Sequence, residues 1–424
     1  MLASKLIASF ENNEQNPMLQ DLYLDASQTE MQKARYIALL KRFIEIYGDK
    51  EVSLFTSAGR TEVSGNHTDH QHGRVLAASI NLDTIAVAAK TKDVIKVVSD
   101  AYDIPEVPAH KVAPEEVGEG TSEALIAGVV AGFENEGWNV GGFEAVMTST
   151  VLAGSGLSSS ASFEVMIGTI LNAFYNDNLI STVDIARVSQ YAENVYFGKP
   201  CGLMDQCACA VGGLITIDFK DPSAPEVRAI NTDFDTLDLV LCITDTKGSH
   251  ADLTHEYAAI PEDMKAVAAC FGKDVLREVD PQAFYAGLAE LREKVSDRAV
   301  LRAIHFFSEN ERVAKAAADL EAGDKEAFLE DIQASGDSSF KYLQNVFAAS
   351  DPANQGVSLG LAVSEQALEG KGVSRVHGGG FAGTIQAFVA SEQAPAYQKA
   401  MDALFGEGSC HLLKIRPVGG SQIL

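Results

Sequence analysis

GSGLSSSAS, residues 154–162, indicates both the fold and the ligand of this chain. Residues 143–156 have the apolar pattern of a strand that runs into a glycine turn, and residues 158–176 have the pattern of a helix. The two glycines let the backbone turn tightly, while serine hydroxyls and unpaired amides gather at the positive end of the helix. We therefore predict a phosphate-binding loop rather than an ordinary serine-capped helix.

Other nucleotide-binding patterns do not fit the chain. The loop has no lysine and so is not a Walker motif, and the catalytic-loop and DFG motifs of protein kinases are missing. Residues 378–383, GGGFAG, match G-x-G-x-x-G, but the dinucleotide-binding fold requires a helix next. TIQAFVA follows and reads as a strand, so we predict a glycine hairpin there instead.

Composition limits the class of partner. The chain has 424 residues and a net charge of −26, which argues against nucleic acid and anionic membranes as partners. No segment reaches 18 uninterrupted apolar residues, and the N-terminal apolar run is short for a secretory signal. The six cysteines form no C-x-x-C pair, which favours free thiols in a reducing compartment. We expect a cytoplasmic protein.

Helical and strand patterns alternate irregularly, which predicts an α+β fold in two lobes. Residues 75–82 and 84–90 read as two separate strands. A turn-rich break at residues 221–225 is the best candidate for a boundary, giving domains 1–222 and 223–424.

Three histidines and an aspartate crowd the segment TEVSGNHTDHQHG, residues 61–73. The residue types alone leave open a metal site, a sugar or phosphate pocket, or a polar loop. Asp205, in an apolar setting, and Glu193, on a predicted helix, are structural or functional carboxylates on the same grounds.

Four segments, taken in chain order, resemble the motifs of galactokinases and of their wider superfamily, the galactokinase/homoserine kinase/mevalonate kinase/phosphomevalonate kinase (GHMP) group. Residues 59–80 resemble the galactokinase signature G-R-x-N-L-I-G-E-H-T-D-Y-x-x-G-x-V-L-P-x-A-I. GSGLSSSAS resembles the second superfamily motif, and RVHGGGFAG, residues 375–383, resembles the third, R-M-T-G-G-G-F-G-G. Residues 192–206 are similar to A-E-H-x-F-x-G-x-P-C-G-I-M-D-Q.

The resemblance implies a two-lobed GHMP kinase fold with the active site between the lobes. It also implies that Mg²⁺-dependent transfer of a phosphoryl group from ATP to the anomeric (C1) hydroxyl of galactose or a related sugar is the reaction. Asp205 would face that hydroxyl as base or electrostatic partner, with Arg60 beside it. Ser160 and Glu193 would hold Mg²⁺. The phosphate loop would comprise Gly154, Ser155, Gly156, Leu157, Ser158, Ser159 and Ser160, and the sugar-binding positions would be Asn66, His67, Asp69, Gly202 and Tyr257.

The departures from the family pattern gather around the sugar. Asn66 replaces a glutamate, and an amide both donates and accepts hydrogen bonds where a carboxylate only accepts them. Residues 61–64 replace V-N-L-I, and Ile260 and Pro261 replace arginines expected after Tyr257. The substrate could therefore be another hexose, an N-acetylated amino sugar, a pentose or a uronic acid. The alternatives are a silent sugar sensor, a metallohydrolase on the histidine cluster, and a kinase for a non-sugar alcohol. We expect a monomer, with a dimer as the alternative.

Overall fold

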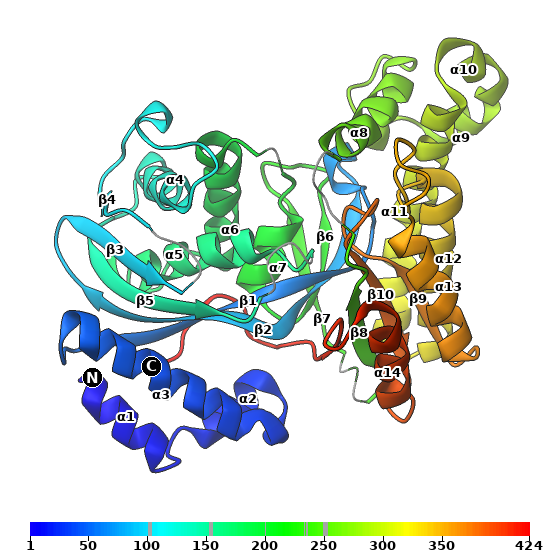
Figure 1. Ribbon diagram of the computed structural model, residues 1–424. Helices are drawn as coiled ribbons and strands as arrows, with labels where there is room; N and C mark the ends of the chain where they lie inside the picture. Colours follow the sequence, from blue (N-terminus) through cyan, green and yellow to red (C-terminus); the bar gives the residue numbers. More distant parts are fainter. Residues whose placement is uncertain (101–103, 152–155, 200, 233, 235, 249–252) are drawn as a thin grey trace.

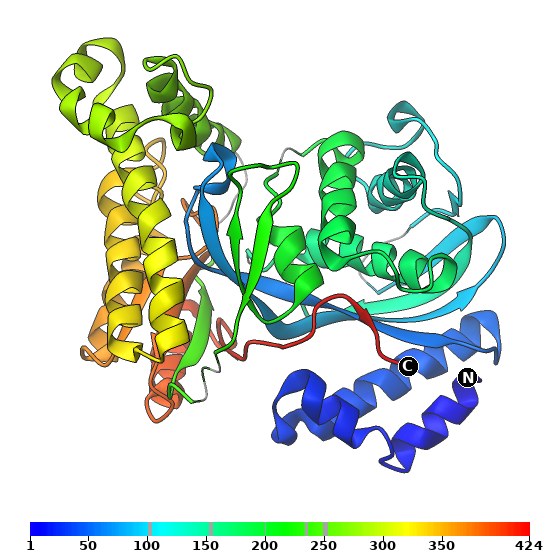
Figure 2. The same ribbon diagram turned by 180° about the vertical axis from the view of Figure 1, so that it is seen from behind.

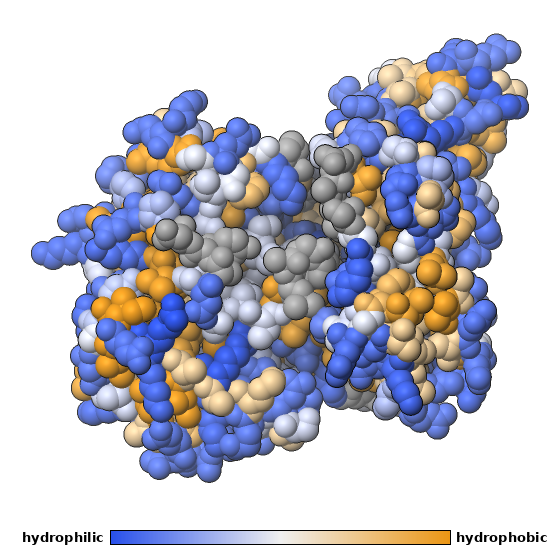
Figure 3. All heavy atoms as spheres, in the orientation of Figure 1, coloured by the Kyte–Doolittle hydropathy of each residue, from blue (hydrophilic) through white to orange (hydrophobic). Residues whose placement is uncertain are grey.

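Two β-sheets organise the chain into two lobes that lie side by side (Figure 1). The computed structural model describes residues 1–100, 104–151, 156–199, 201–232, 234, 236–248 and 253–424. Helices cover both sheets, which confirms the predicted α+β class. Hydrophilic residues dominate the face of the molecule in Figure 3, in keeping with the acidic composition.

The larger sheet has eight strands and is built around a long central pair, β1 and β2. Its order is β12-β1-β2-β5-β3-β4, and in addition β6 pairs with β2 and β7 pairs with β6. β3 and β5 run parallel, whereas β1 and β2 run antiparallel. The strands are β1 (Ser53–Ser64), β2 (Arg74–Lys90), β3 (Val94–Ser99), β4 (Val107–Pro108), β5 (Phe143–Ser149), β6 (Leu214–Asp218), β7 (Glu226–Ile230) and β12 (Ser421–Gln422).

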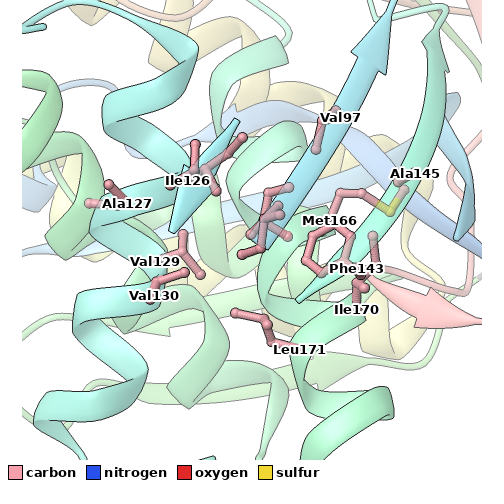
Figure 4. Packing of buried hydrophobic residues seen from close by; sticks show 14 of the residues in the cluster. Val97, Ile126, Ala127, Val129, Val130, Phe143, Ala145, Met166, Ile170 and Leu171 are labelled. Carbon is pink, nitrogen blue, oxygen red and sulfur yellow. The ribbon is translucent and has the colours of Figure 1, made fainter. Parts of the chain in front are cut away.

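Helices pack on both faces of this sheet, which is why β1 is buried from Leu54 to its end. The helices of residues 3–47 lie on one face, and the helices of residues 122–211 lie on the other (Figures 1 and 2). Figure 4 shows the core on the second face, where Ile126 and Val130 from one helix and Met166 and Ile170 from another meet the sheet. The helices are α1 (Ala3–Glu11), α2 (Asn16–Tyr23), α3 (Thr29–Tyr47), α4 (Ser122–Asn135), α5 (Ser159–Tyr175), α6 (Thr182–Tyr191) and α7 (Met204–Val211).

The smaller sheet, in the second lobe, has the antiparallel order β11-β8-β10-β9. Its strands are β8 (Val240–Asp245), β9 (Gly372–Val376), β10 (Thr384–Val389) and β11 (Cys410–Leu413). The helices of this lobe are α8 (Thr254–Ala269), α9 (Pro281–Ala286), α10 (Leu288–Lys294), α11 (Asp297–Ala322), α12 (Lys325–Ser338), α13 (Gly356–Leu368) and α14 (Ala394–Phe405). Short 3₁₀ and π turns are η1 (Ala26–Gln28), η2 (Asp69–Gln71), η3 (Pro114–Glu116), η4 (Ala192–Phe197), η5 (Leu276–Glu278) and η6 (Ser339–Leu343). Within the described ranges, no helix is both long enough and apolar enough to cross a bilayer.

The two strands predicted over residues 75–82 and 84–90 are one continuous strand, β2. The polar residue between them, Asp83, does not start a turn because its buried carboxylate is fully paired. It accepts hydrogen bonds from Arg416 Nη1 at 2.7 Å and Tyr23 Oη at 2.8 Å, and Arg35 also donates to it. These donors come from the C-terminal segment and from the helices under the sheet, so Asp83 ties both to β2.

The chain crosses between the lobes more than once. β7 lies beyond residue 222 but pairs with β6 of the larger sheet, and β12, near the C-terminus, pairs with β1. The division into domains 1–222 and 223–424 stays a prediction. The hydrogen bonding shows that residues from both sides of that boundary build the larger sheet.

Candidate active site

Arg60 and Asp205 form a bidentate ion pair where β1 meets the start of α7. Arg60 Nε donates to Asp205 Oδ1 at 2.8 Å, and Arg60 Nη2 donates to Asp205 Oδ2 at 2.7 Å. The Arg60 side chain is only 7% exposed, whereas 30% of the Asp205 side chain is exposed. The pair is therefore rigidly held but leaves its carboxylate open to a ligand.

The partners of Asp205 keep its carboxyl group ionised. Burial by itself would raise the pKa of Asp205, but the charge of Arg60 and hydrogen bonds from Arg60 and Ser158 bring the pKa below its ordinary value. Ser158 Oγ donates to the same carboxylate. An ionised aspartate that is fixed by an arginine and a serine hydroxyl can orient a hydroxyl of a substrate and accept its proton.

The loop before α5 packs directly against this pair. Gly156 has φ of 71°, and its carbonyl accepts a hydrogen bond from Arg60 Nη1. Ser158 has φ of 60°, a left-handed conformation that is uncommon outside glycine and that gathers at functional sites. The helix begins at Ser159, one residue after the predicted start. Gly154 and Ser155 of the predicted phosphate loop lie outside the described residues.

A second cluster gathers around Glu193, which is 2% exposed. Ser160 Oγ and Lys199 Nζ both donate to Glu193 Oε1, at 3.3 and 3.0 Å. Gln206 Nε2 donates to Glu193 Oε2 at 2.7 Å and to Glu164 Oε2 at 3.3 Å. The sequence-predicted pair Ser160 and Glu193 is thus in contact, and Gln206 and Glu164 are neighbours that sequence reasoning missed.

The residues of this cluster fit a hard cation. A hydroxyl and a carboxylate are the oxygen ligands that Mg²⁺ prefers. Glu164 Oε1 and Gln206 Oε1 are buried without a hydrogen-bond partner, so the cluster has unused acceptor capacity. Burial and the charge of Glu193 raise the pKa of Glu164 well above its ordinary value, as expected when two carboxylates share a buried site.

A cavity of about 680 Å³ opens beside the start of α5. Its size lies within the range of small-molecule pockets, and small hydroxyl-bearing side chains dominate its wall. Its lining comprises Thr84, Ser99, Asp100, Gly120, Thr121, Ser122, Leu125, Met147, Thr148, Ser149, Thr150, Val151, Ser159, Ser160, Phe163 and Phe197. Ser159 and Ser160 belong to the predicted phosphate loop, but the rest of the wall comes from segments that carry no motif, so the pocket as a whole was not predicted.

The histidine-rich loop contributes Asp69 to the surroundings of Asp205. A side chain on Gly202 would put a Cβ 1.9 Å from Asp69 Oδ2, so only glycine allows this close approach. Burial and the charges of Glu62 and Asp205 raise the pKa of Asp69 to about 6, against a hydrogen bond from the His70 amide. The structure therefore brings Asp69, Gly202 and Asp205 together.

His67 and Tyr257 hold the third glycine segment. His67 Nε2 donates to the Gly379 carbonyl at 3.0 Å, and burial lowers the pKa of His67 to about 4, which keeps the ring neutral. Tyr257 Oη donates to the Gly380 carbonyl at 2.8 Å, and burial raises its pKa to about 12. Among the residues that the structure describes, no three His, Cys, Asp or Glu side chains gather as a metal site, so the metal reading of the histidine cluster gains no support.

Asn66 is fully buried, and protein groups occupy its whole amide. Its Nδ2 donates to Glu62 Oε1 at 3.0 Å and to the Gly378 carbonyl at 2.6 Å. Its Oδ1 accepts from Asn345 Nδ2 at 2.7 Å and from Ser339 Oγ at 3.3 Å. In this structure the side chain has no hydrogen-bonding capacity left for a sugar.

Comparison with known proteins agrees with this geometry. The model of the GHMP kinases N terminal domain matches residues 124–213, and the model of the galactokinase galactose-binding signature matches residues 41–90. A galactokinase of Streptomyces coelicolor is 32% identical over 372 residues, covering 86% of this chain and 92% of that protein. A galactokinase of Glaesserella parasuis is 30% identical over 363 residues, covering 84% and 90%.

Solved structures share the fold. The galactokinase of Lactococcus lactis, crystallised with galactose, matches with a TM-score of 0.75 at 24% identity, covering 90% of this chain and 98% of that one. A mevalonate kinase matches with a TM-score of 0.59 at 13% identity, covering 87% and 99%. At these identities the structural likeness concerns the fold, which is the two-lobed one expected from the sequence.

Proposed function

The chain belongs to the galactokinase family of the GHMP kinases, and we propose that it transfers a phosphoryl group from ATP to the anomeric hydroxyl of galactose or a related sugar. The observation that carries the proposal is the bidentate pair of Arg60 and the partly exposed Asp205, set against the loop that opens α5. The products are a sugar 1-phosphate and ADP.

In the proposed reaction Asp205 orients the C1 hydroxyl and takes its proton as the oxygen attacks the γ-phosphorus. The lowered pKa of Asp205 keeps it ionised at neutral pH and so ready to accept a hydrogen bond. Arg60 fixes the carboxylate with two hydrogen bonds and supplies positive charge beside the moving phosphoryl group. Phosphoryl transfer depends mainly on such positioning and charge neutralisation.

We assign the nucleotide to the cavity and loop beside α5. Ser159 and Ser160 line that cavity, and amides and hydroxyls at the start of a helix suit phosphates. The loop from Gly154 to Ser160, including Leu157, would wrap the phosphates. Ser160 and Glu193 would hold Mg²⁺, which when bound neutralises charge on the phosphates. This positive potential is local, so a chain of net charge −26 can bind an anionic substrate.

We assign the sugar to the face of Asp69, Gly202 and Asp205, with His67 and Tyr257 at its border. Asp69 accepts hydrogen bonds from sugar hydroxyls, and Gly202 leaves room for the Asp69 carboxylate. The family points to galactose as the acceptor. Because the sugar-side residues depart from the family pattern, relatives of galactose are included in the proposal. We expect a cytoplasmic monomer, with a dimer as the alternative.

A panel of sugars tests the proposal. Purified protein is incubated with ATP, Mg²⁺ and one sugar at a time, from galactose to N-acetylated amino sugars, pentoses and uronic acids, and ADP release is measured. We expect release above background with galactose or one of its relatives. If no sugar raises ADP release, the kinase proposal fails, and sugar binding by calorimetry without turnover would support a silent sensor instead.

A further inference from the structure

Glu62, on β1, is a carboxylate that the proposed mechanism does not use. We propose that Glu62 accepts a hydrogen bond from a sugar hydroxyl remote from C1 and so helps to set the acceptor specificity, with Asn66 and Arg375 holding it in place. The inference rests on the proposed sugar kinase activity and names a further residue of that site.

Strand geometry points Glu62 to the same side as Arg60. The β1–β2 register is regular across this stretch, with Arg60 opposite Ser79 and Glu62 opposite Ala77. Side chains two apart on a strand share a face and lie about 6.6 Å apart along it. If Asp205 beside Arg60 faces the C1 hydroxyl, Glu62 lies roughly one pyranose ring further along.

The two oxygens of Glu62 have different partners. Oε1 accepts from Arg375 Nη2 at 2.8 Å and from Asn66 Nδ2 at 3.0 Å. Oε2 makes no hydrogen bond with any described residue, although the side chain is only 5% exposed. This oxygen keeps some access from outside the chain and has free acceptor capacity, and a sugar hydroxyl is a donor of suitable chemistry. The charge of Glu62 also acts on both Asp69 and Arg60, which sets it beside the proposed sugar face.

The sequence carries a matching exchange. In the galactokinase signature that residues 59–80 resemble, an asparagine stands at the position of Glu62 and a glutamate at the position of Asn66. Here the two residue types have changed places, and the two side chains are hydrogen-bonded to each other. Because protein groups occupy all four hydrogen-bonding valences of Asn66, the carboxylate with free capacity is the one four residues earlier.

The test compares Glu62→Gln with the wild type on galactose and on its 2-, 3-, 4- and 6-deoxy analogues, or on the corresponding analogues of whichever sugar the panel identifies. Glutamine keeps the shape but loses the charge, so we expect kcat/KM for the parent sugar to fall about 10- to 100-fold. On the one analogue that lacks the contacted hydroxyl, at position 3, 4 or 6, the same substitution should change kcat/KM little, because the contact is already absent. The KM for ATP should stay near the wild-type value.

A purely structural Glu62 gives a different pattern, in which the substitution lowers kcat/KM equally on every analogue, or has no effect on any. Either result overturns the inference. If Glu62→Gln fails to fold in a urea titration, Glu62→Asp replaces it, since it keeps a charged partner for Arg375 but withdraws the carboxylate by one methylene. The same analogue pattern is then expected, and a uniform loss again overturns the inference. A wild type that phosphorylates no sugar would instead refute the proposed function itself.

Discussion

Two residues of β1, Arg60 and Glu62, each take part in an arginine–carboxylate pair, and the two pairs differ in geometry. Arg60 grips both oxygens of Asp205, a side chain that is 30% exposed. Arg375 donates to one oxygen of Glu62, a side chain that is 5% exposed, and the other oxygen has no hydrogen-bond partner among the residues that the structure describes. The first arrangement fixes a carboxylate at an open position, and the second keeps hydrogen-bonding capacity in a buried one.

The difference separates the work of the two regions. The residues around Asp205, Ser160 and Glu193 match the family pattern and are assigned to phosphoryl transfer. The residues around Glu62 and Asn66 depart from that pattern and are assigned to the acceptor. Substitutions in the first region should change turnover or the demand for Mg²⁺, whereas those in the second should change sugar affinity.

Asp205→Asn should have the largest effect. Asparagine cannot take the proton, so kcat should fall by about 10²- to 10⁴-fold while the KM for ATP stays near the wild-type value. Steady-state kinetics with the coupled ADP assay gives both constants. Asp218→Asn is a control, because Asp218 is likewise an arginine-paired aspartate, with Arg74 and Arg277 as its partners, but lies on β6 outside the proposed site. Near-normal turnover of Asp205→Asn would remove Asp205 from its role.

Glu193→Gln should act on the cation and leave the acceptor side intact. Loss of this carboxylate should raise the Mg²⁺ concentration for half-maximal activity by at least about tenfold. Sugar binding measured by calorimetry without nucleotide should not change, since Glu193 contacts Ser160, Lys199 and Gln206 rather than the proposed sugar face. An unchanged demand for Mg²⁺ would contradict the assignment of Ser160 and Glu193.

The pH dependence of sugar use should follow Asp69. With its pKa raised to about 6, Asp69 is ionised at pH 7 and mostly protonated at pH 5, where it accepts hydrogen bonds poorly. We expect kcat/KM for the sugar to fall about tenfold between pH 7 and pH 5 through this group. Asp69→Asn should abolish that acid limb, and an unchanged limb would assign it to another group.

The same shift has a consequence for folding. The pKa of Asp69 is 3.8 in its ordinary, unfolded state and about 6 in the folded chain. Between these two pH values the folded state therefore binds more protons than the unfolded state. The contribution of Asp69 to the free energy of unfolding is therefore lost as the pH rises toward 6. Urea unfolding of the wild type and Asp69→Asn at pH 5 and pH 7 measures this difference.

Tyr257→Phe should have the smallest effect. It removes the hydrogen bond to the Gly380 carbonyl, which costs about 0.5–1.5 kcal/mol in the free energy of unfolding. Turnover should change little, because the hydroxyl lies at the border of the proposed sugar face. Tyr285→Phe, at an exposed tyrosine on α9, is the control for urea unfolding. A loss of turnover as large as that of Asp205→Asn would erase the distinction between the two regions.

The sequence predicted the elements that carry strong local patterns. The glycine-serine turn predicted a helix close to the start of α5. The β-branched and aromatic residues after the third glycine segment predicted β10. Pairing between distant residues was not visible in this way. Asn81 and Asp83 look like turn residues, and β2 runs through them because Arg35 and Arg416, 48 and 333 positions from Asp83, pair with its carboxylate.

The candidate site shows the same limit. The pairing of Arg60 with Asp205 was expected from the family resemblance rather than from either residue's local sequence. The stretch VSLFTSAG, residues 52–59, predicts a strand that enters a turn, whereas β1 continues to Ser64, and Glu62 was missed for this reason. Had the strand been extended, its alternation would have put Glu62 on the face of Arg60. Asn66 stood out because it replaces the glutamate of the family motif. In the structure its side chain donates hydrogen bonds to Glu62 and to the Gly378 carbonyl.

The most direct test of phosphoryl transfer to the anomeric oxygen is the structure of the product. The protein is incubated with ATP, Mg²⁺ and galactose labelled with ¹³C at C1, or the equally labelled form of the preferred sugar, and the product is examined by ¹³C and ³¹P nuclear magnetic resonance. We predict a new phosphate ester whose phosphorus couples to the labelled C1 carbon and which does not form with Asp205→Asn. A phosphate on any other carbon, or no ester with any sugar of the panel, would contradict the assignment.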